Sequence, residues 1–511
     1  MDLWDMAREK REVLTFSTLF TAQNVRDYLS SDEGIAQAID WCRRTAVTKV
    51  YIESFRNGYT AERKTLERAR DRFKGAGFEV AGCVTTTNLG KRSTGWSIIA
   101  CYTDKETQER LQRIFEYTAS MFDLIMIDDF LFTDCQCQEC QLAKGDRSWA
   151  QYRCDLMTRI SRERIIEPAK SVNPKARIII KYPQWYDNFH NRGYDVVRET
   201  EVFDYIWVGT ETRDPDNERW GRKAQYEAYY IMRWLGEIGG EKTGGGWFDP
   251  FGTSPPTYLE QARQTVLADA REVLLFCYGA LQRDTGPANI QHLRREIPYL
   301  YDLADIVRGE PILGISAPKP PNSDPGNEPY VFDFVGMLGL PLVPTAGIEP
   351  EASDALFLSY HALKDEDLKD KLLSTLDSGK PVMLTDGLVG ELEGVDPKVD
   401  NAVILNVGGE PRSLLNLGFE DLRGIRDIML KPFSLKFDAP SRVSLYLFGE
   451  GYLAIESFNE EKVEIVLTGD RIGDSELVLI LPMTATAEMR FSSRSLRAIL
   501  PPRSLTVLRR G

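Results

Sequence analysis

The chain has 511 residues, 42% of them hydrophobic and 27% charged, which is ordinary for a globular protein with more than one domain. Its formal net charge of −14 argues against nucleic acid as the main partner, because phosphate binding needs a basic face. No uninterrupted apolar run reaches about 18 residues, so we expect no membrane-spanning helix, and the polar start MDLWDMAREKREV predicts no secretory signal.

Eight short apolar segments alternate with amphipathic stretches in the first part of the chain. The predicted strands are Val13–Phe20, Lys49–Ser54, Glu79–Thr85, Leu124–Asp129, Arg177–Lys181, Tyr205–Gly209, Lys242–Trp247 and Glu272–Tyr278. The predicted helices are Gly34–Thr45, Ala61–Lys74, Lys105–Met121, Ser148–Ser171, Gly193–Thr200, Arg219–Glu237, Pro256–Ala270 and Asn289–Val307. Eight strand–helix units predict a (β/α)8 TIM barrel. The alternative, an open doubly wound sheet, usually carries a glycine-rich loop after its first strand, and here that turn reads TLFTAQN.

Two further domains are predicted after the barrel, which we assign to residues 1–310. A stretch rich in proline and glycine, 308–330, predicts a linker. Residues 311–430 alternate again between strand-like and helical segments, which indicates a small α/β domain that resembles the glutamine-amidotransferase fold. No cysteine follows Cys277, so a Cys–His glutaminase is excluded and we expect a structural or oligomerising role. Residues 431–511 show the period-two pattern of an antiparallel β-sandwich.

Carboxylates stand at the ends of several predicted barrel strands, where (β/α)8 enzymes place their reactive groups. Asp128 and Asp129 follow the apolar run Leu124–Ile127, Glu211 follows the sixth strand, and Asp249 follows the seventh. Because successive strand residues point to opposite sides, we expect at most one of Asp128 and Asp129 to face the barrel mouth. Glycoside cleavage uses two carboxyl groups, one to protonate the leaving oxygen and one to attack or to activate water.

Aromatic and charged side chains accompany these carboxylates and are typical of a sugar site, because rings stack on sugars and polar groups bind hydroxyls. The candidate binding residues are Glu53, Arg56, Lys181, Tyr182, Trp185, Arg213 and Trp247. Arg56, Lys181 and Arg213 could equally receive a uronate or a sulfate. Structural alternatives exist for several of them: Glu53 could pair with Arg56, Glu211 could pair with Arg213, and the tryptophans could be rim packing.

Three cysteines, Cys135, Cys137 and Cys140, occur in C-x-C-x2-C spacing after the fourth predicted strand. This spacing favours a zinc ion, which takes four ligands in a tetrahedron. We expect Cys101 to be the fourth ligand of a structural site, with Cys83 and Cys154 as rivals, and three free thiols as the alternative. Reduced thiols with a metal fit a cytoplasmic protein, and we expect no cofactor for catalysis.

This cysteine pattern and the order of the three domains resemble glycoside hydrolase family 42, the β-galactosidases. The resemblance implies a structural zinc ion, a trimer formed through the amidotransferase-like domain, an acid/base at the position of Asp129 and a nucleophile near Asp249. The sequence departs from the family pattern, because Asp128 and Asp129 stand where the family has Asn-Glu and no Glu ends the seventh strand. The chain also looks like α-galactosidase-type barrels, in which Asp129 or Asp128 would attack and Glu211 would be the acid/base.

The leading hypothesis is a glycoside hydrolase that acts on an oligosaccharide or a glycoside, with Asp129 and Glu211 as the preferred pair and Asp249 as the third candidate. We expect a carbohydrate substrate and a homo-oligomer, trimer or dimer. One alternative is an inactive carbohydrate-binding or scaffold barrel. Another is a barrel lyase or isomerase that acts on a sugar acid with Lys181 as base.

Overall fold

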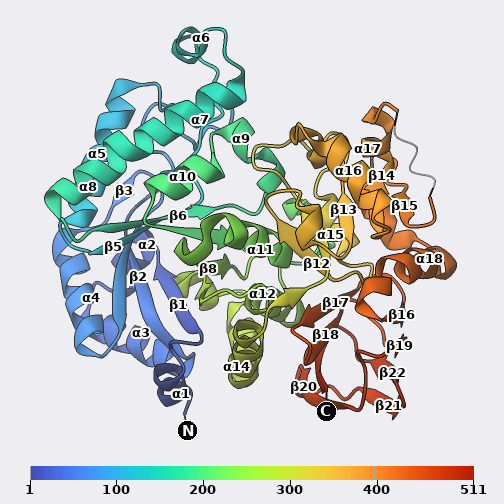
Figure 1. Ribbon diagram of the computed structural model, residues 1–511. Helices are drawn as coiled ribbons and strands as arrows, with labels where there is room; N and C mark the ends of the chain where they lie inside the picture. Colours follow the sequence, from blue (N-terminus) through green and yellow to red (C-terminus); the bar gives the residue numbers. More distant parts are fainter. Residues whose placement is uncertain (1, 222, 395–398, 511) are drawn as a thin grey trace. The chain divides into compact units, whose positions relative to one another are not determined.

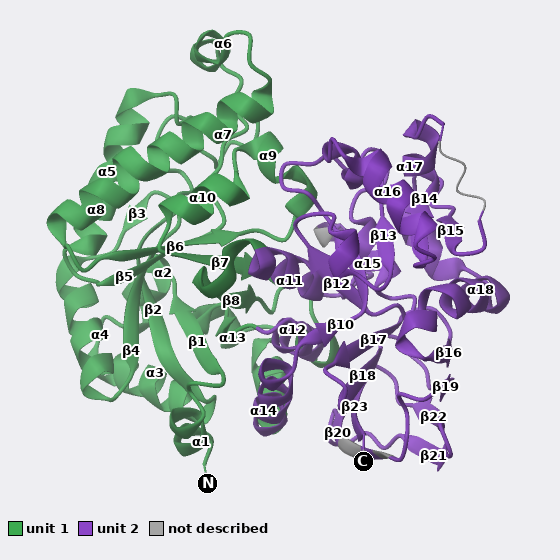
Figure 2. Cartoon of the chain, viewed as in Figure 1, with its two compact units in different colours: residues 1–211, 238–258, 270–297 green, residues 212–237, 259–269, 298–511 purple. Residues whose placement is uncertain are grey.

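The structure is a computed structural model that describes residues 2–510 apart from 222 and 395–398. The chain forms two compact units, shown in different colours in Figure 2. Unit 1 comprises Met1–Glu211, Ile238–Tyr258 and Ala270–Ile297. Unit 2 comprises Thr212–Glu237, Leu259–Asp269 and Pro298–Gly511.

Unit 1 contains a closed barrel of eight parallel strands. Its strands are β1 (Thr15–Phe20), β2 (Val47–Arg56), β4 (Glu79–Val84), β5 (Leu124–Ile127), β6 (Arg177–Tyr182), β7 (Tyr205–Gly209), β8 (Thr243–Phe248) and β9 (Glu272–Leu275). Each strand pairs in parallel with the next along this series, and β1 pairs with both β2 and β9, which closes the barrel. The short strand β3 (Tyr59–Thr60) runs antiparallel to the end of β2. The predicted barrel is therefore confirmed, and the open sheet is excluded by the closure.

Helices cover the outside of these strands, as Figure 1 shows for α3, α4, α5 and α8. The helices from the first strand to the last part of the barrel sequence are α2 (Ala22–Tyr28), α3 (Asp32–Arg44), α4 (Arg63–Gly75), α5 (Lys105–Ala119), α6 (Gln138–Lys144), α7 (Trp149–Ile160), α8 (Glu167–Val172), α9 (Phe189–Arg192), α10 (Val196–Val202), α11 (Glu227–Gly239), α12 (Pro255–Leu267), α13 (Tyr278–Leu281) and α14 (Gly286–Gly309); α1 (Leu3–Glu9) precedes them. Local sequence sets their ends: Ser148 caps α7 and forms a capping box with Gln151.

The helix predicted over Arg219–Glu237 begins later than expected, at Glu227. A 3-10 turn at Glu218–Trp220 ends at Gly221, whose φ of 85° is in the left-handed region. Glycine adopts this conformation without steric cost, and it stops a right-handed helix. Residue 222 of the predicted helix lies outside the described residues.

The barrel interior is filled by every second strand residue, as the pleat requires. The buried interior cluster includes Leu19, Tyr51, Ala81, Cys83, Met126, Ile179, Trp207, Trp247 and Leu274. Trp207 also explains the glycines of β8: a Cβ on Gly245 would lie 3.0 Å from its ring and 2.2 Å from the carbonyl oxygen of Glu272. Because the alternation continues, Glu53 and Lys181, two residues beyond Tyr51 and Ile179, face the same interior at the C-terminal ends of β2 and β6.

Unit 2 contains a parallel sheet in the order β12-β11-β13-β14-β15 and two antiparallel sheets, β10-β17-β18-β23-β20 and β16-β19-β22-β21. The parallel strands are β11 (Ile315–Pro318), β12 (Leu342–Thr345), β13 (Leu356–Leu358), β14 (Val382–Thr385) and β15 (Ala402–Leu405), accompanied by α15 (Val331–Val335), α16 (Leu368–Asp377), α17 (Asp386–Glu391) and α18 (Phe419–Met429). The antiparallel strands are β10 (Ile312–Leu313), β16 (Lys436–Asp438), β17 (Val443–Phe448), β18 (Tyr452–Ser457), β19 (Val463–Thr468), β20 (Ser475–Leu481), β21 (Glu488–Ser492), β22 (Ser495–Leu500) and β23 (Ser504–Arg510).

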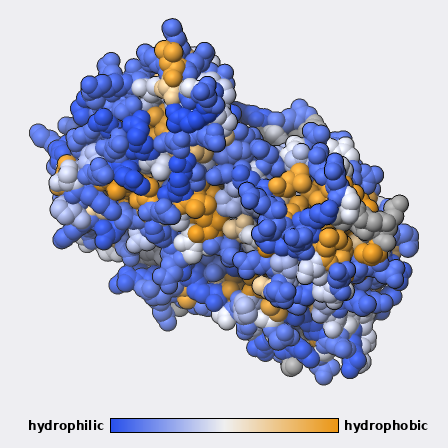
Figure 3. All heavy atoms as spheres, turned by 45° about the horizontal axis from the view of Figure 1, so that its top comes forward, coloured by the Kyte–Doolittle hydropathy of each residue, from blue (hydrophilic) through white to orange (hydrophobic). Residues whose placement is uncertain are grey.

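The predicted linker 308–330 is wrong for its first part, because β10 and β11 lie within it. β11 pairs with both β12 and β13, so pairing across the sheet outweighs the surrounding prolines and glycines. None of the described helices is long and apolar enough to cross a membrane. On the face shown in Figure 3, hydrophobic side chains gather in small patches among hydrophilic ones.

Candidate active site

A single buried lysine connects the carboxylates at the barrel's C-terminal end. Lys181 extends from β6, and its Nζ lies 2.9 Å from Asp129 Oδ2, 2.9 Å from Glu211 Oε1 and 3.9 Å from Asp128 Oδ1. The ring centroid of Trp247 lies 4.3 Å from the same nitrogen. Burial works against the charge of Lys181, but Asp129, Glu211 and Asp128 outweigh it and raise the pKa of the ammonium. The lysine therefore stays charged and draws three carboxylates together.

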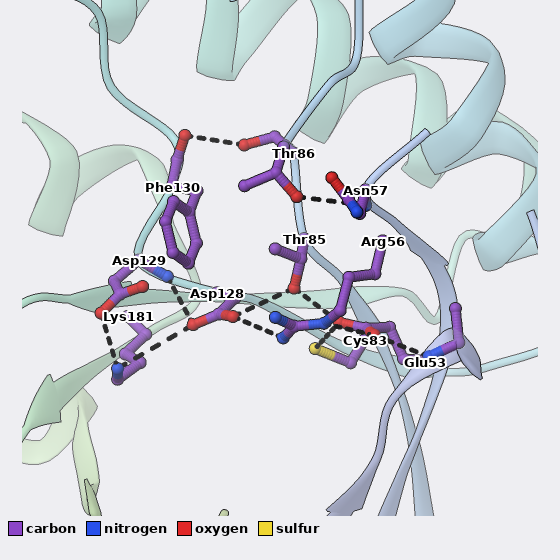
Figure 4. A network of polar contacts seen from close by, with 12 residues as sticks. Glu53, Arg56, Asn57, Cys83, Thr85, Thr86, Asp128, Asp129, Phe130 and Lys181 are labelled. Atoms are coloured by element: carbon purple, nitrogen blue, oxygen red, sulfur yellow. Dashed lines mark hydrogen bonds and ion pairs between the residues drawn. The ribbon is translucent and has the colours of Figure 1, made fainter. Parts of the chain in front are cut away.

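A second cation, Arg56, fixes Asp128 from the opposite side (Figure 4). Arg56 donates to Asp128 Oδ2 at 2.6 Å and to Glu53 Oε2 at 2.8 Å. The hydroxyl of Thr85 donates to Glu53 Oε1 at 2.5 Å and lies 3.1 Å from Asp128 Oδ2. Burial alone would raise the pKa of Asp128, but Arg56 and Lys181 lower it. Asp128 is thus a fixed, charged group of the site floor.

Asp129 differs from its neighbour in exposure and in protonation. Its side chain is 15% exposed, whereas that of Asp128 is 3% exposed. Burial raises the pKa of Asp129 to about 7; Lys181 opposes this shift, and the charges of Asp128 and Glu211 add to it. Of the two adjacent aspartates, Asp129 is the one that a substrate can reach and the one able to carry a proton near neutral pH.

Glu211 follows β7 and folds back over it toward Lys181. Its Oε1 accepts from Lys181, and its Oε2 is buried without a hydrogen-bond partner among the described residues. Gly209 makes this position possible, because a Cβ there would lie 2.6 Å from Glu211 Oε2. The site therefore contains a desolvated carboxylate oxygen with free lone pairs.

The spacing of Asp129 and Glu211 limits the mechanism. Their contacting oxygen atoms each lie 2.9 Å from Lys181 Nζ, so they are separated by no more than twice that distance. Retaining glycosidases hold two carboxyl groups about 5–5.5 Å apart, whereas inverting enzymes leave about 6.5–9.5 Å for a water molecule. This upper limit on the distance between two oxygen atoms is compatible with the closer, retaining spacing.

The structure corrects two predicted sugar-binding residues. Tyr182 is fully buried, and its ring packs against Phe189 and Tyr194 with centroid distances of 5.6 and 5.5 Å. It follows Lys181 on the strand and so points away from the interior. Trp247 is also buried; it stacks on Phe276 at 4.8 Å and supports Lys181, which leaves no free ring face for a sugar.

The other candidates fall into four groups. Glu53 and Arg56 belong to the carboxylate network, and Trp185 is half-buried at the rim, 5.2 Å from the ring of Phe132. Asp249 is buried, and its Oδ1 accepts from the backbone N–H of Phe251 at 3.1 Å, which is a turn contact. Arg213 belongs to unit 2, where its backbone N–H donates to Gln261, and it stays a prediction as a binding residue.

Sequence reasoning missed Thr85, which joins Glu53 to Asp128. Its position directly after β4, at the active end of the barrel, was the signal that could have found it.

The four predicted cysteine ligands lie together, their sulfur atoms all within 4.8 Å of one another. The Cys101–Cys137, Cys101–Cys140 and Cys137–Cys140 distances are 3.8, 3.5 and 3.7 Å. Zn–S bonds of about 2.3 Å in a tetrahedron place sulfurs about 3.8 Å apart, so the residues fit a metal ion.

The two rival cysteines lie elsewhere. Cys83 faces Glu53 in the barrel interior, and Cys154 contacts the carbonyl oxygen of His190. The prediction of Cys101 as the fourth member of the cluster therefore agrees with the geometry.

Comparison with known proteins adds a family and a fold. The family described as "Probable glycosyl hydrolase, catalytic domain" matches residues 4–303, more than half of the chain. An uncharacterized protein of Saccharolobus solfataricus is 26% identical over 378 residues, which are 67% of this chain; the chain spans 62% of that relative's length.

Among solved structures, Gan42B, a GH42 β-galactosidase from G. stearothermophilus, is similar with a TM-score of 0.59 in the form of a catalytic mutant. The match covers 97% of this chain and 98% of that one at 10% identity. Gan42B without this substitution gives a TM-score of 0.58. At this identity the likeness shows the fold alone, and it confirms the expected resemblance in architecture.

Proposed function

Because the chain belongs to the family described as "Probable glycosyl hydrolase, catalytic domain", which matches residues 4–303, we propose that it is a glycosidase and that Asp129 and Glu211 are its catalytic pair. The observation that carries this assignment is the shared contact of both carboxylates with Lys181 at 2.9 Å. Their spacing supports a retaining mechanism, in which a covalent glycosyl-enzyme intermediate forms.

We assign the acid/base role to Asp129 and the nucleophile role to Glu211. Asp129, with its pKa raised to about 7, carries a proton for the leaving oxygen and is partly exposed. Lys181 holds the carboxylate of Glu211 through Oε1, and we assign the attack on the anomeric carbon to this carboxylate. The departing glycoside oxygen takes the proton of Asp129; the ionised Asp129 then accepts a proton from the water that hydrolyses the sugar ester.

The charge of the site supports a neutral sugar as substrate. Four carboxylates, those of Glu53, Asp128, Asp129 and Glu211, face only Arg56 and Lys181 in this network. Both cations are already satisfied by protein carboxylates, so a uronate or sulfate would meet repulsion rather than a free cation. This argues against the acidic-sugar alternative and against Lys181 as a free base.

Hydrolysis of a panel of nitrophenyl glycosides tests the assignment. Glu211→Gln and Asp129→Asn should each lower kcat by roughly 10²–10⁴-fold, while Asp71→Asn on the exposed surface serves as the control. With azide, Asp129→Gly should yield a glycosyl azide of retained configuration and Glu211→Gly one of inverted configuration. The family 42 arrangement would instead be supported by two results together. Asp249→Gly would lose activity and form a glycosyl azide of inverted configuration with azide, and Glu211→Gln would keep its activity. Formation of an unsaturated sugar, which absorbs in the ultraviolet, would indicate a lyase.

We also propose that Cys101, Cys135, Cys137 and Cys140 hold a structural zinc ion. A closed set of four thiolates leaves no open coordination position for catalysis. Elemental analysis should find about one zinc per chain, lost in Cys137→Ser and kept in Cys154→Ser. Iron in place of zinc, or no metal, would reject this identity.

A homo-oligomer and a cytoplasmic location are further proposals. The resemblance to glycoside hydrolase family 42 implies the homo-oligomer, and the eight cysteines without a disulfide support the cytoplasmic location. Light scattering of the purified protein should give the mass of a trimer or a dimer.

A further inference from the structure

An aromatic cluster lies beside the proposed acid/base. Phe130 directly follows Asp129, and the ring of Trp96 lies 5.8 Å from that of Phe130. The buried ring of Phe132 lies 6.3 Å from the ring of Trp96 and 5.2 Å from that of Trp185. Trp96 is 47% exposed, and Phe130 and Trp185 are half-buried. We call Trp96, Phe130 and Trp185 the aromatic shelf.

The loop that carries Trp96 is held in place by a carboxylate. Asp134 accepts from the backbone N–H of Trp96 at 2.9 Å and from the hydroxyl of Ser93 at 2.5 Å, and it pairs with Arg192 at 3.2 Å. Gly95 is required there, because a Cβ would lie 2.5 Å from the Asp134 carboxylate. These contacts hold in place a loop whose large apolar side chain remains half in solvent.

The cysteine cluster joins the two segments that form the shelf. Cys101 follows Trp96 by five residues, and Cys135 follows Asp134 directly. A metal bound to these sulfurs would tie the segment of Trp96 to the segment of Phe130. The carbonyl oxygen of Phe130 is fixed separately by the hydroxyl of Thr86 at 2.8 Å.

We propose that the aromatic shelf binds the leaving-group sugar of an oligosaccharide, and that the cysteine metal site positions it. This rests on the proposed catalytic pair, because the leaving group must lie next to the acid, here Asp129. Aromatic rings stack on the apolar faces of sugars. The natural substrate is then a disaccharide or a longer neutral oligosaccharide, and the metal contributes to specificity without touching the reacting atoms.

The test compares two substrates built on the glycosyl group that the nitrophenyl panel selects. One is the glycosyl fluoride, which has no leaving-group sugar, and the other is a disaccharide, in which a second sugar is the leaving group. Trp96→Ala should lower kcat/KM for the disaccharide roughly 3- to 10-fold and leave that for the fluoride within about twofold. Leu142→Ala, at another exposed apolar side chain, is the matched control. Equal losses on both substrates, or no loss on the disaccharide, would overturn the proposal.

Binding measurements test the role of the metal site without turnover. In Glu211→Gln, calorimetry should show tighter binding of the disaccharide than of the monosaccharide. Adding Cys137→Ser, or the milder Gly95→Ala that disturbs only the Asp134 contact, should remove this difference and make Trp96 more open to acrylamide quenching. An unchanged difference in both folded variants would reject the link. If Glu211→Gln remains fully active, the proposed catalytic pair fails independently.

Discussion

Asp128 Oδ1 accepts a hydrogen bond from the backbone N–H of Asp129 at 2.8 Å. This contact turns the first carboxylate back toward the chain and into the Arg56 network, while the second carboxylate points to Lys181. Two adjacent acids thereby acquire opposite properties: the pKa of Asp128 is lowered and that of Asp129 is raised.

The pH profile should report Asp129. The acid form is needed in the free enzyme, so kcat/KM should fall as the pH rises through about 7, the value to which burial raises the pKa of Asp129. Lys181 lowers this pKa, so in Lys181→Met the fall of kcat/KM should move to higher pH, and the rate should also be reduced. If kcat/KM of Lys181→Met falls at the same pH as that of the wild type, the assignment of the proton to Asp129 would be contradicted.

Asp129→Asn should raise thermal stability at pH 8 but not at pH 4. An unfolded aspartate has a pKa of about 3.9, whereas the pKa of Asp129 in the folded protein is about 7. Between these values the folded state binds more proton, so ionisation costs stability as the pH rises. The neutral variant avoids this cost, and Tm at pH 8 should rise by roughly 2–4 °C. Calorimetry at both pH values measures the difference, and an equal gain at pH 4 would exclude this cause.

Asp128→Asn should destabilise the barrel instead. The substitution removes one buried partner of Arg56 and leaves its ion pair with Glu53. Breaking a buried ion pair from one side costs about 3 kcal/mol, so urea unfolding should shift to lower concentration. Asp71→Asn breaks an exposed pair with Arg70 and should cost under about 1 kcal/mol. Equal effects of the two substitutions would show that Asp128 is not part of a tight network.

Gly209→Ala should lower activity through Glu211. The new Cβ would lie 2.6 Å from Glu211 Oε2, so the carboxylate must move away from its contact with Lys181. Misplacing a reacting group by about 1 Å can cost roughly 10²-fold in rate. Gly236→Ala, where a Cβ meets nothing within 4 Å, is the control and should keep full activity. Wild-type kcat in Gly209→Ala would argue that Glu211 does not attack the sugar.

The sequence by itself determined the helices and strands and the strand ends that carry the candidate catalytic residues. Apolar runs of strand length, alternating with amphipathic helices, predict the barrel because side-chain periodicity is a local property of the chain. The same holds for Asp128, Asp129 and Glu211 at strand ends and for the C-x-C-x2-C spacing. The helix predicted from Arg219 begins only at Glu227. The stretch with β10 and β11 was mistaken for a linker, because the strand character of β11 depends on its neighbours in the sheet.

Tertiary structure decided which of these residues act together. Lys181 contacts Asp129, from which it is separated by 52 positions in the sequence, and Glu211, from which it is separated by 30. No local sequence pattern encodes such pairs. The same reason explains the burial of Tyr182 and Trp247, the choice of Cys101 over Cys83, and the unforeseen place of Trp96 beside Phe130. Side-chain partners are set by the closure of the barrel, which brings the ends of distant strands to one face.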